Sequence, residues 1–187
     1  MNFYNVAIGA VRSVLNVFIL FKRKGEENIP KEGGFLLCSN HKGVIDPVLL
    51  AAGCKRQLTF MAKEELFKVF LLGPLIKALG AFPIKRGKGD AAAVMATLKI
   101  LKRGGATLIF PEGTRMKNGE RKEVSSGIIR LAIQSGVPIV PAYVTKNTVT
   151  YGKPLLFTDE IENVQDALKM QLLANRLMDT IYSLGEV

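Results

Sequence analysis

The sequence predicts a single layered α/β domain with a central, largely parallel or mixed sheet flanked by helices, preceded by an amphipathic N-terminal helix. Three observations carry this prediction. The chain has 187 residues, a length typical of one domain with a sizeable core. After Pro30, short apolar runs alternate with stretches of helical periodicity, the order that βα units produce. Residues 3–21 repeat apolar side chains with the period of a helix.

The alternation after Pro30 gives each expected element a residue range. Short apolar runs predict buried strands, and longer periodic stretches with start or stop signals predict helices. The last helix is the acidic one. The expected strands are 34–40, 58–62, 82–84, 106–111 and 138–144, and the expected helices are 46–54, 65–80, 89–105, 123–135 and 163–184.

Proline predicts two irregularities in this pattern. Gly73-Pro74 interrupts the stretch 65–80 and predicts a break or kink there, because proline lacks the N–H of a helix interior. The expected strand 138–144 contains Pro138 and Pro141. Since proline cannot donate to a ladder, this strand is expected at a sheet edge or with an irregular end.

The N-terminal segment 3–21 leaves three interpretations open. It approaches the length of a membrane span, about 20 apolar residues, but Arg12 lies in its middle, at a cost of roughly 2.5–3.5 kcal/mol for insertion. We favour an interfacial helix, residues 1–22, that associates with a membrane ahead of a domain formed by residues 23–187. A helix buried in the domain and a true span or signal segment are the alternatives. On a helical wheel, one side of the segment carries Asn5, Arg12 and Asn16.

The charge balance narrows the classes of partner. The chain carries 26 Lys and Arg against 16 Asp and Glu, a formal net charge of +10, and 48% of its residues are hydrophobic. This combination excludes a disordered basic tail and favours an anionic partner. The absence of Trp, the 7% aromatic content and the lack of any RRM, HTH or zinc pattern argue against nucleic acid. Residues 154–187 are acidic overall, so the basic character belongs to the preceding chain.

The loop after the strand 34–40 contains the single histidine of the chain, His41. Imidazole is the natural general base at neutral pH, because its unperturbed pKa is about 6.5. Asp46 follows across a glycine-containing turn, so its carboxylate can reach the Nδ1–H of the histidine. Loops at the carboxyl ends of parallel strands are the usual place for a site. The pair indicates a base and its orienting carboxylate; an ordinary polar loop residue remains the alternative.

Two more loops carry side chains suited to a phosphate. In residues 80–89, Lys85, Arg86 and Lys88 alternate with glycines and offer charge-assisted donors beside flexible backbone N–H groups. A solvated turn is the alternative. In residues 110–115, a Glu-Gly-Thr turn precedes an arginine and is suited to a hydroxyl and a phosphate together. This loop lacks the spacing of a nucleotide P-loop, which disfavours nucleotide binding.

Four segments, NHKGVID, GAFPIKR, FPEGTR and VPIVPAY, follow one another in the chain and resemble the four blocks of the glycerolipid acyltransferase family. The resemblance covers residues 24–150. It implies that His41 is the catalytic base and that Asp46 orients it. The second and third blocks then hold the phosphate and glycerol of the acceptor, and the fourth shapes the site or packs. The candidate substrate-binding residues are Asn40, Lys85, Arg86, Glu112, Gly113, Thr114 and Arg115.

The resemblance implies acyl transfer from an acyl thioester, acyl-CoA or acyl-ACP, to the sn-2 hydroxyl of 1-acyl-glycerol-3-phosphate, giving phosphatidic acid. Glycerol-3-phosphate or another lysophospholipid as acceptor, and a non-catalytic module that binds anionic lipid, are the alternatives. We expect no metal and no cofactor beyond the thioester co-substrate. The expected partners are the lysophospholipid, the acyl carrier and a membrane surface. The expected location is the cytoplasmic face of the cell membrane, with peripheral or monotopic attachment.

The two cysteines, Cys38 and Cys54, form neither a disulfide framework nor a zinc pattern. Both are predicted to be buried free thiols. Cys38 lies close to His41 in the sequence, so an acyl-enzyme on Cys38 is a minor alternative. Its expected position inside an apolar strand disfavours that chemistry.

Overall fold

The computed structural model describes residues 3–84, 90–115, 124–158 and 166–186. Within these ranges, strands form one sheet in the order β1-β7-β6-β2-β5-β3-β4. Neighbouring strands are parallel throughout, except for the antiparallel pair β6 and β7. The predicted α/β domain with a largely parallel, mixed sheet is confirmed. The strands are β1 Lys22–Lys24, β2 Phe35–Ser39, β3 Leu58–Lys63, β4 Ala81–Ile84, β5 Ala106–Ile109, β6 Ile139–Val144 and β7 Thr148–Tyr151.

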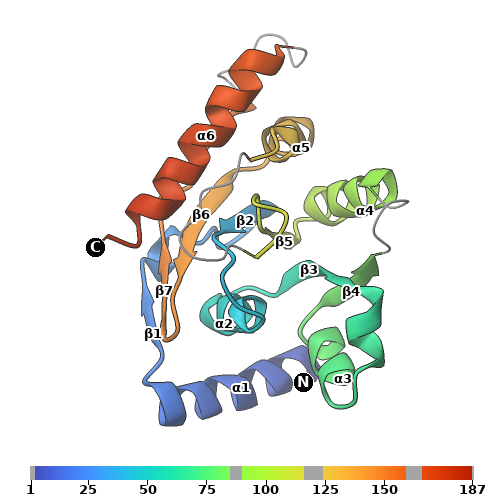
Figure 1. Ribbon diagram of the computed structural model, residues 1–187, viewed down its shortest axis with the longest axis vertical. Helices are drawn as coiled ribbons and strands as arrows, with labels where there is room; N and C mark the ends of the chain where they lie inside the picture. Colours follow the sequence, from blue (N-terminus) through green and yellow to red (C-terminus); the bar gives the residue numbers. More distant parts are fainter. Residues whose placement is uncertain (1–2, 85–89, 116–123, 159–165, 187) are drawn as a thin grey trace.

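Helices cover both faces of the sheet (Figure 1). One layer contains α1 Phe3–Ile19, α2 Asp46–Gly53 and α3 Leu72–Ala78, and the other contains α4 Asp90–Lys102, α5 Gly127–Ser135 and α6 Ala167–Ser183. Two short 3-10 helices, η1 Glu26–Asn28 and η2 Glu64–Lys68, complete the described elements.

The central strand β2 joins the two hydrophobic cores. Phe35 and Leu37 point toward the α1–α2–α3 layer, while Leu36 and Cys38 point toward the other layer. All four side chains are fully buried. This two-residue alternation is what a parallel strand covered on both faces requires, and it holds the loop that follows β2 on a rigid base.

Each of the five expected strands is present, and two further strands were not predicted. β1 consists of three exposed basic residues, and β7 of four residues with alternate burial. A strand that short, with no buried side, leaves no apolar run in the sequence, so periodicity could not reveal β1. The expected helix 123–135 begins later, at Gly127, and the expected start of the helix 163–184 lies outside the described residues.

The prediction that Gly73-Pro74 breaks its helix is wrong. The break falls at Val69–Leu71, between η2 and α3, where Leu71 has a left-handed backbone with φ 64°. Pro74 lies in the first turn of α3. The first N–H groups of a helix have no intrahelical partner, so a proline there removes no hydrogen bond.

The prediction of an edge position for the strand at 138–144 is also wrong. β6 lies inside the sheet, between β7 and β2. The backbone explains the tolerance for proline. The carbonyl of Pro141 accepts a hydrogen bond from Gly152 N at 2.8 Å. Gly152 directly follows the last residue of β7. The edge of Pro141 that lacks an N–H therefore faces the end of the β6–β7 ladder. Ile139 and Val140 are fully buried, which agrees with the packing interpretation of this segment.

The N-terminal helix α1 packs on the domain along one side, where Tyr4, Ile8 and Leu15 are buried. Its opposite side is apolar and exposed, with Val17 at 74% and Phe18 at 78% of full exposure. Among the described residues, no helix combines the length and hydrophobicity that crossing a bilayer requires.

The helical wheel grouped Arg12 with Asn5 and Asn16, which are exposed, whereas Arg12 is partly buried. Its guanidinium turns inward and donates to Ala52 O at 2.6 Å and to Cys54 O at 2.8 Å. These carbonyls terminate α2, where a helix presents unpaired acceptors and partial negative charge. The central arginine is therefore a cap that joins α1 to α2.

Candidate active site

The candidate site lies at the carboxyl ends of β2 and β5, which are neighbours near the middle of the sheet. The loop 40–45 follows β2, and the loop 110–115 follows β5. In parallel strands these ends meet at one edge of the sheet. The two loops that are 70 residues apart in sequence are consequently adjacent, and His41 N donates to Glu112 Oε2 at 3.0 Å.

His41 and Asp46 form the pair that their spacing predicted. Nδ1 of His41 lies 3.0 Å from Asp46 Oδ2. The same carboxylate oxygen also accepts from Lys42 N at 2.6 Å and Gly43 N at 2.7 Å. Three donors thus hold the Asp46 carboxylate, which is itself the first residue of α2 and 6% exposed. Negative charge at a helix N-terminus is favourable.

Gly43 lets this loop close over the carboxylate. A Cβ at this position would lie 3.2 Å from Asp46 Oδ1, tighter than ordinary van der Waals contact. A larger residue would therefore push the loop away and loosen the hydrogen bonds to Asp46. Gly43, which the sequence indicated only as part of a turn, is therefore also required for close packing against Asp46.

The imidazole ring of His41 is held by a stacking contact as well as by the hydrogen bond at Nδ1. The ring of Phe110 stacks on it with centroids 4.0 Å apart and an interplanar angle of 19°. Because Asp46 occupies Nδ1, Nε2 is the ring nitrogen left to exchange a proton with a ligand. A carboxylate at Nδ1 sets the tautomer that a general base needs.

Glu112 was predicted to bind substrate, and the structure engages both of its oxygens inside the protein. Oε2 accepts from His41 N at 3.0 Å, and Oε1 accepts from the hydroxyl of Tyr182 at 2.6 Å. The residue is 7% exposed. In this arrangement Glu112 positions the backbone of His41.

Asn40, the other candidate from the first loop, is fully buried. Its Oδ1 accepts from Val144 N at 2.7 Å, and its Nδ2 donates to Val144 O at 3.0 Å. The amide thus forms a two-bond link between the end of β2 and the end of β6. The structure places it under the site, out of solvent, where it fixes the start of the loop.

The remaining candidates divide into two groups. Gly113, Thr114 and Arg115 are exposed. Gly113 closes a turn in which its N–H donates to Phe110 O at 3.0 Å. Gly113 has φ 68°, a left-handed backbone that suits glycine. Lys85 and Arg86, which directly follow β4, lie outside the described residues.

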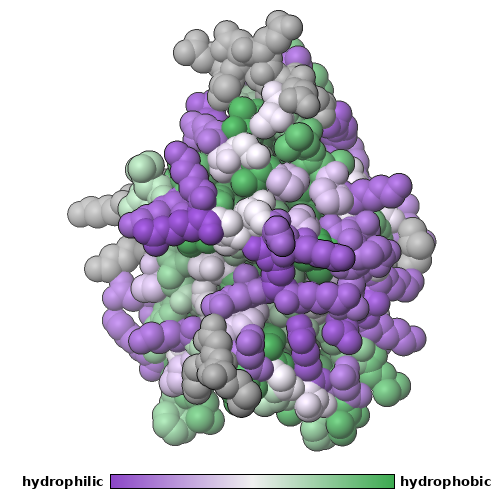
Figure 2. Space-filling view, turned by 180° about the vertical axis from the view of Figure 1, so that it is seen from behind, coloured by the Kyte–Doolittle hydropathy of each residue, from purple (hydrophilic) through white to green (hydrophobic). Residues whose placement is uncertain are grey.

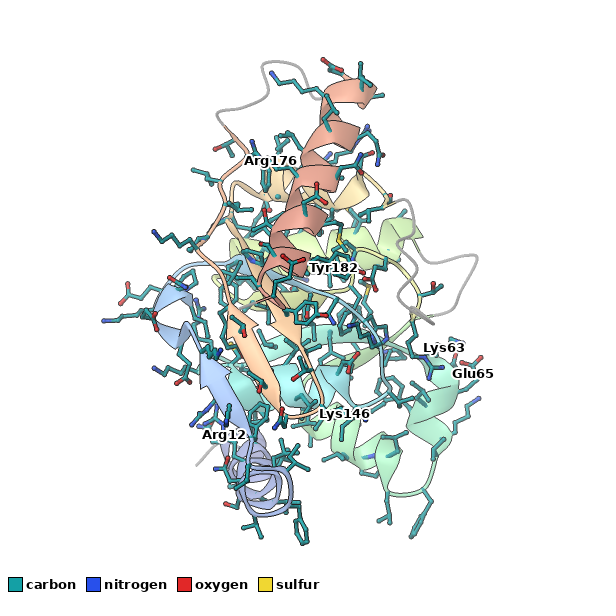
Figure 3. The ribbon with its side chains drawn as sticks, turned by 60° about the vertical axis from the view of Figure 1, so that its left-hand side comes forward. Arg12, Lys63, Glu65, Lys146, Arg176 and Tyr182 are labelled. Carbon is teal, nitrogen blue, oxygen red and sulfur yellow. The ribbon has the colours of Figure 1, made fainter. Side chains whose placement is uncertain are left out.

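Sequence reasoning missed several residues at this edge of the sheet or in contact with its loops. Phe110 lies within the third block but was not assigned a role, and Lys42 Nζ donates to the hydroxyl of Tyr143 at 2.7 Å. Lys63 ends β3, between β5 and β4, and is labelled in Figure 3. A search for every polar residue at a strand end would have found Lys63. No sequence pattern pointed to Tyr182, because it lies far beyond the four family blocks.

The cysteines do not take part in this site. Cys38 faces the core on the α4–α5–α6 side and is fully buried, and burial raises the pKa of its thiol. Burial also raises the pKa of Cys54 to about 11. A thiol is a nucleophile only as its thiolate, so the geometry disfavours an acyl-enzyme on Cys38.

A carboxylate-held histidine at the carboxyl edge of a parallel sheet, beside a Glu-Gly-Thr-Arg turn, defines the class of enzymes that activate a hydroxyl group for attack on an acyl carbon. The profile of the Acyltransferase family matches residues 21–145, and this chain belongs to that family. The match includes the loops of His41, Asp46 and Glu112, and it leaves out α1 and α6.

Relatives with known names agree with this assignment. The 1-acyl-sn-glycerol-3-phosphate acyltransferase of Bacillus subtilis is 31% identical over 140 residues, which cover 74% of this chain and 69% of the relative. The enzyme of the same name from Streptococcus pneumoniae is 30% identical over 175 residues, 86% of this chain and 64% of the relative. The chain thus spans about two thirds of the length of both.

A solved structure shares the fold. The crystal structure of the 1-acyl-sn-glycerophosphate (LPA) acyltransferase PlsC from Thermotoga maritima matches with a TM-score of 0.68 at 21% identity. The match covers 94% of this chain and 79% of that chain. It extends beyond the family profile and therefore takes in most of the helices at the two ends of the chain.

Proposed function

We propose that this protein transfers a fatty acyl group from an acyl thioester to the sn-2 hydroxyl of 1-acyl-glycerol-3-phosphate, giving phosphatidic acid. The observation that carries the proposal is the His41–Asp46 pair, with Nδ1 held at 3.0 Å from the carboxylate, next to the FPEGTR loop. The names of the relatives from Bacillus subtilis and Streptococcus pneumoniae support the choice of acceptor.

The reaction needs one base and correct positioning. His41 Nε2 takes the proton from the acceptor hydroxyl, and the oxygen attacks the thioester carbonyl carbon. The C–S bond of the tetrahedral intermediate then breaks, and the imidazolium returns the proton to the leaving thiolate. Asp46 stabilises the imidazolium through Nδ1. Direct transfer requires no cofactor beyond the thioester, whether its carrier is coenzyme A or acyl carrier protein.

Cations around the site supply the counter-charge for the acceptor phosphate. Arg115 follows Glu112 on the loop after β5, and Lys63 ends the adjacent strand β3. Lys85 and Arg86 follow β4 in the sequence and remain candidates, although they lie outside the described residues. Arginine and lysine bind phosphate through charge-assisted hydrogen bonds.

The lipid tails need an apolar surface, and the molecule has one at the end formed by α1 and α3. The exposed residues there include Val17 and Phe18 of α1 and Phe70 and Leu71 before α3. Figure 2 shows hydrophobic side chains gathered at this end, with hydrophilic side chains over the middle of the molecule. We infer that this end lies on the membrane surface, with α1 in the interface and the basic strand β1 beside it.

This attachment is peripheral or monotopic, and a cytoplasmic acyl carrier implies the cytoplasmic face. The substrate could then remain in the bilayer while its headgroup enters the site.

The test is a panel of acceptors crossed with both carriers. Purified protein is incubated with lysophosphatidic acid, glycerol-3-phosphate or lysophosphatidylcholine, each with acyl-CoA or acyl-ACP, and the lipid products are separated by chromatography. We expect phosphatidic acid from lysophosphatidic acid with at least one carrier. Transfer only to glycerol-3-phosphate would replace the acceptor, and no transfer to any acceptor would overturn the proposal.

A further inference from the structure

The last turn of α6 reaches the active site from outside the segment that the family profile matches. That match ends at residue 145, whereas α6 ends at Ser183. The hydroxyl of Tyr182 donates to Glu112 Oε1 at 2.6 Å. Figure 3 shows Tyr182 at the lower end of α6, where the helix approaches the middle of the sheet. The same carboxylate holds the backbone of His41, so Tyr182 is one residue removed from the base.

This hydrogen bond is of the strong kind. A hydroxyl that donates to a carboxylate typically does so at 2.5–2.7 Å, and Tyr182 lies within that range of Glu112. Glu112 is 7% exposed, so few water molecules could replace a missing donor. A buried carboxylate that loses a donor carries the full cost of its desolvation. Tyr182 therefore fixes Oε1 and, through it, the direction of Oε2 toward the His41 N–H.

The position of the Tyr182 ring does not depend on its hydroxyl. The preceding turn of α6 buries Met178 and Ile181 in the core. The Tyr182 ring meets the ring of Tyr143 edge-on, with centroids 6.2 Å apart. Gly185 lies so close to Tyr143 that a Cβ at this position would overlap the ring. Removing the hydroxyl from Tyr182 therefore leaves the aromatic ring where it is and deletes the hydrogen bond to Glu112.

We propose that Tyr182 is a positioning residue of the active site, which acts through Glu112 to fix the backbone N–H of His41. The inference rests on the proposed function. His41 is then held at two points, its ring by Asp46 and its backbone by Glu112. Small displacements of a base relative to its substrate cause large losses of rate, so the hydroxyl of Tyr182 contributes to turnover without touching the substrate.

The first test is the kinetics of Tyr182→Phe. We expect kcat to fall about tenfold, the size of one charge-assisted hydrogen bond, with both KM values unchanged. Tyr151→Phe is the matched control, because it removes a buried tyrosine hydroxyl that donates to Leu50 O at 3.5 Å, away from Glu112. A Tyr182→Phe enzyme with wild-type kcat would overturn the proposal. So would a raised acceptor KM at wild-type kcat, which marks direct binding to the substrate.

The second test asks whether Tyr182 acts through Glu112. Glu112→Gln keeps the shape of the side chain but replaces one acceptor oxygen with an NH2 donor, so the side chain can no longer accept from both the His41 N–H and the Tyr182 hydroxyl. In the Glu112→Gln background, Tyr182→Phe should cause no further loss of kcat, because the two residues act as one unit. Independent losses that multiply would show that Tyr182 acts elsewhere and would refute this mechanism.

The third test needs no substrate, so it separates this inference from the proposed function. The chain has one histidine, and selective ¹⁵N-histidine labelling therefore gives one backbone amide signal in a ¹H–¹⁵N NMR spectrum. We expect Tyr182→Phe to shift that signal and Tyr151→Phe to leave it in place. A wild-type protein without transfer activity would defeat the proposed function only. An unmoved His41 signal in Tyr182→Phe would defeat the role of Tyr182.

Discussion

The first and last helices, α1 and α6, are each 17 residues long, cover opposite faces of the sheet and lie outside the segment that the family profile matches. From each helix, a polar side chain reaches into the protein and joins it to a neighbouring element. Arg12 of α1 donates to the last carbonyls of α2, and Tyr182 of α6 donates to Glu112.

Their outer sides differ. α1 exposes a largely apolar side, including Val14, Val17 and Phe18, whereas the exposed residues of α6 include Arg176 and Asp179, with Leu168 and Leu172 near its start. A helix whose outer side is apolar fits a lipid surface, and a helix whose outer side is mixed fits water. We infer that the two helices have separate tasks: α1 offers an apolar side to the lipid surface proposed above, and α6 supports the base through Tyr182.

The largest effect should come from the base itself. His41→Ala removes the base, and we expect transfer to fall by about 10²–10⁴-fold, the usual contribution of general acid–base catalysis. Formation of phosphatidic acid measures the loss. The urea unfolding curve should stay close to that of the wild type, because the histidine side chain is partly exposed. Full turnover in a folded His41→Ala protein would contradict the mechanism.

The next effect separates the outer sides of the two helices. Phe18→Asp with Phe70→Asp places charges on the apolar end, and we expect binding to phosphatidylglycerol vesicles to weaken at least about tenfold, because each large apolar side chain contributes roughly 1.5–3 kcal/mol when buried. Vesicle sedimentation gives the bound fraction.

The matched control is Leu168→Asp with Leu172→Asp, which adds the same two charges to exposed apolar positions of α6. Vesicle binding should fall much less in this variant, by the change in net charge alone. Equal losses in the two double variants would remove the distinction between the helices.

A smaller effect concerns the inner side of α1. Arg12→Met deletes two hydrogen bonds to the end of α2, and we expect the free energy of unfolding to fall by about 2 kcal/mol, since the site is partly exposed. Urea denaturation measures it. Ser13→Ala removes an exposed hydroxyl that bonds within α1 and should change stability by less than about 0.5 kcal/mol. A stability of Arg12→Met equal to that of Ser13→Ala would show that the cap contributes nothing.

The smallest effect is expected at the two cysteines, one in each layer. Cys54 packs in the core beside α1, and Cys38 packs in the core beside α6. Cys38→Ala should retain nearly full transfer activity, and neither thiol should react with a maleimide in the native protein at neutral pH. Rapid labelling of native Cys38, or loss of turnover in a folded Cys38→Ala protein, would revive the acyl-enzyme alternative.

The direction of the pH dependence follows from the same burial. Burial raises the pKa of Cys54 to about 11, above the value of about 8.5 in an unfolded chain. The unfolded state therefore loses its proton first, and the free energy of unfolding should fall as the pH rises from about 8.5 toward 11. Replacement of Cys54 by alanine should make this part of the profile less steep in urea denaturation, while the buried Cys38 keeps its own contribution.

The layered fold and the His41–Asp46 pair could be predicted from the sequence because both depend on local patterns. Apolar runs mark buried strands, and a histidine at a strand end can meet an aspartate on the same turn. The edge strand β1 and the contact of Tyr182 with Glu112 could not be predicted. β1 buries no side chain, and Tyr182 is 70 residues from its partner, so neither leaves a periodic signal.

Two predictions failed because the chemistry of proline depends on its exact surroundings. Pro74 lies in the first turn of α3, and Pro141 lies at the point where its ladder with β7 ends. In both places proline lies at the end of a helix or of a ladder, where the lack of one N–H interrupts no continuous run of hydrogen bonds. Arg12 shows that the same holds for a charged residue. A helical wheel gives the direction of its side chain, but it does not reveal the carbonyl groups of α2 that accept its hydrogen bonds.

The two edge strands of the sheet affect the tendency of the protein to aggregate at high concentration. β1 and β4 are the borders, and each leaves backbone groups that another chain's strand could join. β1 carries Lys22, Arg23 and Lys24, and β4 contains Pro83. Charge and proline are the features that discourage strand addition. On the membrane surface proposed above, copies would meet at high local concentration, and we expect these borders to discourage their sheets from joining.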